Sequence, residues 1–125
     1  MYSERLLDHF QNPRHVGELA PPAIVVEVVN PACGDIMRLS VRFEGERVVE
    51  VGYKTRGCTA SIATGSATVE WMMGRTRTEL GAVKGSDLEE AVGGLIPESK
   101  HAAVLCVDAI RAVLRSDPEH PSIRS

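Results

Sequence analysis

The sequence predicts an α+β fold in which a three-stranded antiparallel sheet packs against several helices. Three observations predict this class. Residues 24–55 hold three segments rich in strand-forming side chains, separated by short turn sequences. After residue 58 the apolar side chains recur at helical spacing instead. A short amphipathic segment before residue 13 adds one helix ahead of the sheet.

The first predicted helix begins after Ser3, whose hydroxyl can cap it. Three apolar side chains are expected on one side of this helix: Leu6, Leu7 and Phe10. Pro13 ends the helix, because the residue before a proline avoids the helical conformation. His9 is interpreted as an ordinary surface residue.

The sheet is predicted from three strands and two turns. Residues 24–29 are rich in β-branched side chains, and residues 36–43 alternate between apolar and polar ones. One face of that second strand is apolar: Met37, Leu39, Val41 and Phe43. Residues 47–55 return as the third strand. The turns fall at residues 30–35 and 44–46, and such short hairpin turns join antiparallel neighbours.

Helices are predicted for the rest of the chain. One covers residues 60–73, and two short helices follow it. Thr76 and Glu79 have the spacing of a helix-capping box, and Ser86 and Glu89 repeat that spacing.

The last helix is predicted with Pro97 in its first turn. Its apolar residues recur at helical spacing: Val104, Leu105, Ile110, Val113 and Leu114. Pro118 and Pro121 are expected to close a frayed tail after this helix.

Length and composition limit the function. The chain has 125 residues, the size of one domain, so residues 1–125 are expected to form a single unit. Its formal net charge of −3, with scattered lysines and arginines, argues against nucleic-acid binding. No apolar stretch approaches the roughly 20 residues of a membrane span, and the N-terminus does not resemble a signal peptide. A cytoplasmic protein with reduced cysteines is expected.

Four residues are candidates for a metal site. Cys33 lies in the turn between the first two strands, followed by Gly34, which tolerates a positive φ, and by Asp35. Cys58 precedes the long helix, where the helix dipole favours the metal-binding thiolate. His101 lies in the first turn of the last helix, where the neutral, metal-binding imidazole is favoured. Structural alternatives stay open: buried cysteines, a turn-forming aspartate and a surface histidine.

The third cysteine, Cys106, falls among the apolar residues of the last helix and is interpreted as a core residue. No Cys-x-x-Cys pair occurs, so the zinc-finger and thioredoxin interpretations have no support. Any site that uses several cysteines must therefore be assembled by the fold.

The motifs around these residues have a known counterpart. Residues 30–35 read Asn-Pro-Ala-Cys-Gly-Asp, and residues 57–63 place small side chains after Gly57-Cys58. Residues 100–110 begin with Lys-His and end with Asp-Ala-Ile. Together with the opening segment, residues 2–19, they resemble the NifU N-terminal or IscU-type family of iron–sulfur cluster assembly scaffolds over nearly the whole chain.

The resemblance implies an IscU/NifU-N-like sheet with the site at one end. It implies a scaffold or carrier protein, not an enzyme, that accepts sulfur from a cysteine desulfurase and iron from a donor. The cluster, expected to be [2Fe–2S], then passes to apo-proteins. Cys33, Cys58 and His101 match family ligand positions, and Asp35 matches an aspartate associated with cluster lability. Some members bind zinc at the same site.

Two departures from the family pattern bear on mechanism. Ala102 replaces the cysteine that usually accepts sulfur, and Cys106, about 6 Å further along the helix axis, is the alternative acceptor. Residues 95–100 depart from the Leu-Pro-Pro-Val-Lys segment read by a dedicated chaperone, which argues against chaperone-driven release. The chain also lacks the insertion that marks the zinc-dependent sulfur-acceptor branch.

Three hypotheses follow for the function. The first is a transient cluster scaffold with Cys33, Cys58 and His101 as ligands and Asp35 as the fourth, more labile partner. The second is a zinc-bound sulfur-transfer protein, since the same four residues form a complete tetrahedral set. The third is a regulatory paralogue without cluster chemistry, which the missing cysteine at position 102 favours.

Overall fold

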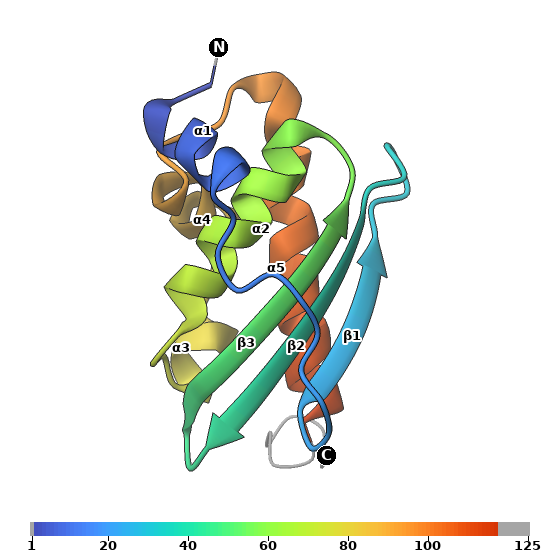
Figure 1. The fold of residues 1–125 in the computed structure, drawn as a ribbon, viewed down its shortest axis with the longest axis vertical. Coiled ribbons are helices and arrows are strands. Elements are labelled where there is room, and N and C mark those ends of the chain that lie inside the picture. Colours follow the sequence, from blue (N-terminus) through green and yellow to red (C-terminus); the bar gives the residue numbers. More distant parts are fainter. Residues whose placement is uncertain (1, 118–125) are drawn as a thin grey trace.

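The computed structural model describes residues 2–117. It confirms the predicted α+β class, with a three-stranded antiparallel sheet and helices packed against it. In chain order the elements are α1 (Glu4–Gln11), β1 (Ile24–Val29), β2 (Ile36–Glu44), β3 (Arg47–Arg56), α2 (Thr59–Met72), α3 (Arg77–Gly81), α4 (Gly85–Ala91), the 3₁₀ turn η1 (Pro97–Ser99) and α5 (His101–Ser116). Figure 1 shows α5 behind the sheet, and the segment between α1 and β1 crossing its front.

The register of the sheet brings two chain turns to one edge. The strand order is β1-β2-β3, and Ile36, the first residue of β2, pairs with Val29 on one side and Arg56 on the other. The turn between β1 and β2 therefore lies beside the end of β3, near the start of α5 in the upper part of Figure 1. This edge is where the predicted ligands converge.

The inner face of the sheet forms the core with α5 and α2. The predicted apolar face of β2 is confirmed at Met37, Leu39 and Val41, which are all buried, while Phe43 packs partly buried at its margin. Four of the five apolar residues expected on one side of α5 are buried: Leu105, Ile110, Val113 and Leu114. The fifth, Val104, is exposed instead. Burial of these side chains on both layers fixes the direction of α5, and with it the position of His101.

The prediction of which side chains of α1 lie on its buried side was wrong in part. Leu6 is buried, but Leu7 and Phe10 are 40% and 39% exposed, and His9 is buried with 3% of its surface exposed. His9 turns toward α2 because Nδ1 has a partner there, the hydroxyl of Ser66, at 2.8 Å. Burial lowers the pKa of His9, which favours the neutral ring in this contact.

The capping predictions were confirmed at two helices and wrong at one. Ser3 accepts a hydrogen bond from the backbone N–H of Leu6, and Thr76 with Glu79 forms the predicted capping box of α3. The box expected at Ser86 is not formed, because α4 begins at Gly85 and Asp87 accepts from the N–H of Lys84 instead. The capping box therefore lies two residues before the expected one, because the carboxylate of Asp87, and not that of Glu89, accepts from the start of the helix.

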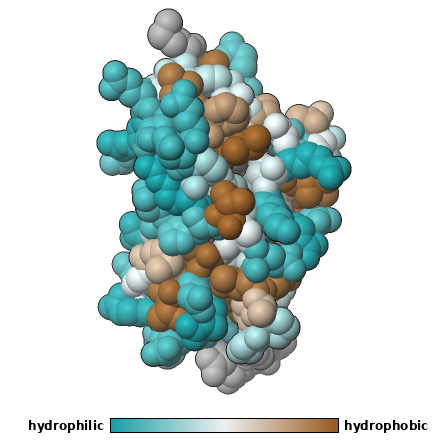
Figure 2. Space-filling view, viewed as in Figure 1, coloured by the Kyte–Doolittle hydropathy of each residue, from teal (hydrophilic) through white to brown (hydrophobic). Residues whose placement is uncertain are grey.

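The C-terminal part matches the predicted helix closely. Pro97 opens the η1 turn, which runs directly into α5, so His101 is the first residue of that helix. The tail expected after Pro118 lies outside the described residues. Within residues 2–117 no helix is long and apolar enough to cross a membrane. On the face shown in Figure 2, apolar side chains form separate spots among hydrophilic ones.

Candidate metal centre

The four predicted site residues come from three segments that meet at one end of the sheet. Cys33 and Asp35 lie in the turn between β1 and β2, where Gly34 has a φ of +77°. Cys58 is the N-cap of α2, two residues after the end of β3, and His101 begins α5. The fold therefore brings together residues that are up to 68 positions apart, from 33 to 101.

Three of the four residues have ligand atoms close enough to share one ion, and Cys58 lies beside this group. One ligand atom each from Cys33, Asp35 and His101 lie within 4.8 Å of one another. Cys58 joins this group through His101, since its Sγ is 3.5 Å from Nε2. The same Nε2 is 3.6 Å from Oδ2 of Asp35. Cys33 and Cys58 are exposed, whereas Asp35 is buried.

The imidazole of His101 is held in the orientation that a metal ligand needs. Its Nδ1 lies 3.1 Å from the backbone carbonyl oxygen of Glu98, in the η1 turn just before α5. With the Nδ1 proton donated to that carbonyl, Nε2 presents its lone pair to Cys58 and Asp35. In that tautomer the ring offers Nε2 to an ion placed between these side chains.

Asp35 is kept ionised by hydrogen bonds that outweigh its burial. Burial alone would raise its pKa. The hydroxyl of Ser61 donates to Oδ2 at 2.5 Å, and the backbone N–H of Cys58 donates to the carboxylate as well. The nearby thiol groups of Cys58 and Cys33 lower the pKa further. The net effect is a pKa below the ordinary value, so the carboxylate is charged at neutral pH and can ligate a cation.

Two residues that shape this centre were missed in the sequence analysis. Ser61 is the third residue of α2, and a side chain there reaches back to the N-cap, here Cys58. The Cys-x-x-Ser spacing was a signal that could have identified it. Gly57 is needed for space, because a Cβ on it would lie 2.5 Å from Cγ of Asp35. No local signal marks Gly57, since Asp35 is remote in sequence.

Cys106 is not part of the centre. Its thiol is buried in the core with 0% exposure, which confirms the core interpretation. Burial raises its pKa to about 12, and the nearby hydroxyl of Thr68 offsets this only in part. The thiol stays protonated and enclosed in the folded protein, so a bulky sulfur donor has no access to it. The alternative role of sulfur acceptor has no support from this geometry.

The burial of Cys106 predicts an alkaline loss of stability. Above the ordinary thiol value of 9.0 the unfolded chain releases a proton that the folded chain retains up to about 12. The free energy of unfolding should therefore fall by about 1.4 kcal/mol between pH 8 and pH 10. Urea denaturation of the reduced, metal-free protein would measure this. Cys106→Ala should remove most of the fall and leave the smaller part that the buried Tyr53 contributes, since burial raises the pKa of Tyr53 to about 12. An equal fall in both proteins would contradict the assignment.

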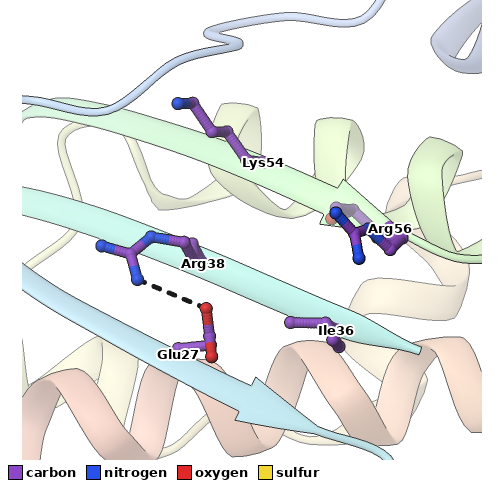
Figure 3. Close-up of a pocket in the computed structure, with 6 residues that line it drawn as sticks. Glu27, Ile36, Arg38, Lys54 and Arg56 are labelled. Atoms are coloured by element: carbon purple, nitrogen blue, oxygen red, sulfur yellow. Dashed lines mark hydrogen bonds and ion pairs between the residues drawn. The ribbon is translucent and has the colours of Figure 1, made fainter. Parts of the chain in front are cut away.

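A separate depression of about 340 Å³ lies on the outer face of the sheet. Six residues line it: Glu27, Ile36, Arg38, Lys54, Thr55 and Arg56. Figure 3 shows Arg38 directed at Glu27, and these side chains form an ion pair of 3.3 Å. None of the lining residues carries a thiol or an imidazole, and the lining carboxylate is already paired. This depression is a mainly basic surface of the sheet and does not resemble a second metal site.

Comparisons with known proteins agree with the resemblance seen in the motifs. A family model described as the NifU-like N terminal domain matches residues 1–121. The iron–sulfur cluster assembly scaffold protein IscU of Azotobacter vinelandii is 40% identical over 118 residues, covering 91% of each chain. The protein of the same name from Escherichia coli (strain K12) is 38% identical over 117 residues, covering 90% of this chain and 91% of that relative.

Solved structures share the fold. A SUF-system protein of Fervidobacterium islandicum AW-1 matches with a TM-score of 0.72 at 22% identity, covering 89% of this chain and 94% of that chain. A nitrogen-fixing NifU-like N-terminal region from Brucella abortus matches with a TM-score of 0.62 at 22% identity, covering 88% and 77%. At such identities these two likenesses bear on the fold alone.

Proposed function

The chain belongs to the family of NifU-like N-terminal domains, and on that premise we propose that residues 1–125 act as one iron–sulfur cluster assembly scaffold. The protein accepts sulfur and iron, holds a transient cluster and transfers it to apo-proteins. The observation that carries this proposal is the convergence of two exposed thiols, a buried carboxylate and an oriented imidazole at one edge of the sheet.

The chemistry of these groups suits a cluster that is held and then released. Thiolate and imidazole are preferred ligands of iron–sulfur centres, and four protein ligands satisfy a [2Fe–2S] cluster. Cys33, Cys58 and His101 supply three of them. Asp35 supplies a carboxylate, which binds such a centre less tightly than a thiolate does. Because this fourth ligand is weaker, the cluster can be released to an acceptor protein.

Sulfur enters this scaffold through an exposed thiol. Ala102 has none, and Cys106 is buried, so the persulfide of a cysteine desulfurase is received at Cys33 or Cys58. There, the thiolate attacks the outer sulfur of the persulfide and displaces the donor's thiolate. An iron donor and apo-protein acceptors complete the set of partners. We place the reaction in the cytoplasm, where thiols stay reduced.

A zinc-bound sulfur-transfer protein is the second candidate. Three of the ligand atoms lie within 4.8 Å of one another, which favours one small ion. Two thiolates, one imidazole and one carboxylate also form a tetrahedral zinc set. In this candidate zinc would hold the centre together while an exposed cysteine carries sulfur, and no cluster would form.

Anaerobic reconstitution separates the candidates. The protein is incubated with ferrous iron, cysteine, a cysteine desulfurase and a dithiol that reduces the delivered persulfide to sulfide, then assayed for iron, zinc and acid-labile sulfide. Iron with matching sulfide is the expected result for a scaffold. Tightly held zinc without sulfide would replace the scaffold with the sulfur-transfer candidate. Binding of neither metal would point to a regulatory paralogue.

The role of Asp35 gives a further prediction. Asp35→Cys replaces the weak fourth ligand with a thiolate, so cluster transfer to an apo-ferredoxin should slow by about tenfold under reducing, anaerobic conditions. Circular dichroism of the ferredoxin would follow the transfer. Asp108→Cys, the same change at an exposed position of α5, serves as the control. Unchanged transfer from Asp35→Cys would show that Asp35 is not a ligand.

A further inference from the structure

Ser61 has a special position in this centre because it contacts two of the four ligands. It is 1% exposed, so its hydroxyl is shut off from bulk water. Its Oγ lies 2.5 Å from Oδ2 of Asp35 and 3.5 Å from Sγ of Cys58. A serine hydroxyl has one proton to donate, and the short distance gives that proton to the carboxylate.

The oxygen that Ser61 holds is the one that faces the other ligands. Oδ2 of Asp35 accepts from Ser61, and the same Oδ2 is 3.6 Å from Nε2 of His101. If Asp35 and His101 shared a metal ion, Asp35 would bind it through Oδ2. This oxygen already accepts a charge-assisted hydrogen bond from Ser61. The hydroxyl competes with the metal for the electron density of that oxygen.

Ser61 also contacts a second candidate ligand, Cys58. Sγ of Cys58 is 3.5 Å from Oγ of Ser61, so the thiol can donate to this oxygen while Ser61 donates to Asp35. The hydroxyl is thereby fixed between the two side chains, with its single proton directed at Asp35.

We propose that Ser61 is a positioning residue that restrains Asp35 from firm ligation and thereby sets how fast the centre releases a bound metal or cluster. This inference rests on the ligand set of the proposed function, but not on cluster assembly. Its consequence is a centre in which lability comes from a hydroxyl of α2 as well as from the weak carboxylate itself.

The test uses Zn²⁺ alone as the probe. Zinc-loaded full-length proteins are mixed with an excess of a chromophoric chelator, and the rate of zinc release is recorded. Ser61→Ala should release zinc about tenfold more slowly than the wild type, since a hydrogen bond to a charged group is among the stronger ones. Ser61→Thr keeps the hydroxyl and should restore the wild-type rate. Ser86→Ala, at an exposed serine of α4, should leave the rate unchanged.

A second background distinguishes restraint from general support of the fold. Asp35→Asn keeps the shape of the side chain and removes its value as a ligand. In that background, Ser61→Ala should change zinc release less than twofold, because the restrained ligand is absent. Faster release from Ser61→Ala, or an equal effect in both backgrounds, would overturn the proposal. A wild-type protein that fails to bind Zn²⁺ would overturn the ligand set itself. If the protein binds Zn²⁺ but assembles no cluster, the zinc-release rates still decide the role of Ser61.

Discussion

Replacing Cys58 with alanine is expected to lower the affinity for zinc by more than about 100-fold. Loss of a residue that only supports a ligand costs up to about 100-fold, and loss of a ligand itself should cost more. The same change should prevent cluster accumulation during reconstitution. Cys58 is an exposed thiol at the N-cap of α2, 3.5 Å from Nε2 of His101, and no other described cysteine except Cys33 is accessible to replace it. Competition with a chelator of known affinity measures the loss.

The matched control for this experiment is a second cysteine of the same chain. Cys106→Ala makes the same chemical change at a thiol buried in the core, away from the centre. Its affinity for zinc should stay close to that of the wild type, although its stability is lower because a small cavity is left. Cys33→Ala should behave like Cys58→Ala. If Cys106→Ala lost zinc as strongly as Cys58→Ala, the ligand set would be wrong.

Changing Gly57 to alanine is expected to damage the centre without removing any ligand. The new Cβ would lie 2.5 Å from Cγ of Asp35, closer than side-chain atoms approach, so the carboxylate must move. Overpacking of this kind costs about 1–3 kcal/mol of stability. We expect zinc affinity to fall by about tenfold or more, because the displaced carboxylate no longer lies where it can share an ion with the other three side chains.

A different glycine tests whether the effect is local. At Gly81, the last residue of α3, a Cβ would meet only Cδ1 of Leu114, at an ordinary distance of 3.8 Å. Gly81→Ala should leave zinc affinity unchanged and stability equal or slightly higher, since alanine favours a helix. Urea denaturation and zinc titration of both variants decide the matter. Equal zinc affinity in Gly57→Ala and the wild type would mean that zinc binding does not depend on the position of the Asp35 carboxylate.

The local elements were accessible from the sequence because they depend on neighbouring residues. The alternation in residues 36–43 and the β-branched run in residues 24–29 gave strands with these bounds or within one residue of them. The hydroxyl of Ser3 and the pair Thr76 and Glu79 gave helix starts for the same reason, since each bond joins residues three apart. The candidate ligands were found by their motifs, which are local as well.

The sequence by itself therefore determined the strands, most of the helices and the identity of the candidate ligands. The tertiary structure decided what depends on contacts between distant segments. It buried His9 against Ser66, placed Ser61 and the space above Gly57 beside Asp35, and enclosed Cys106 in the core. Such contacts join residues that are tens of positions apart, and side-chain packing, which no local pattern records, fixes their distances.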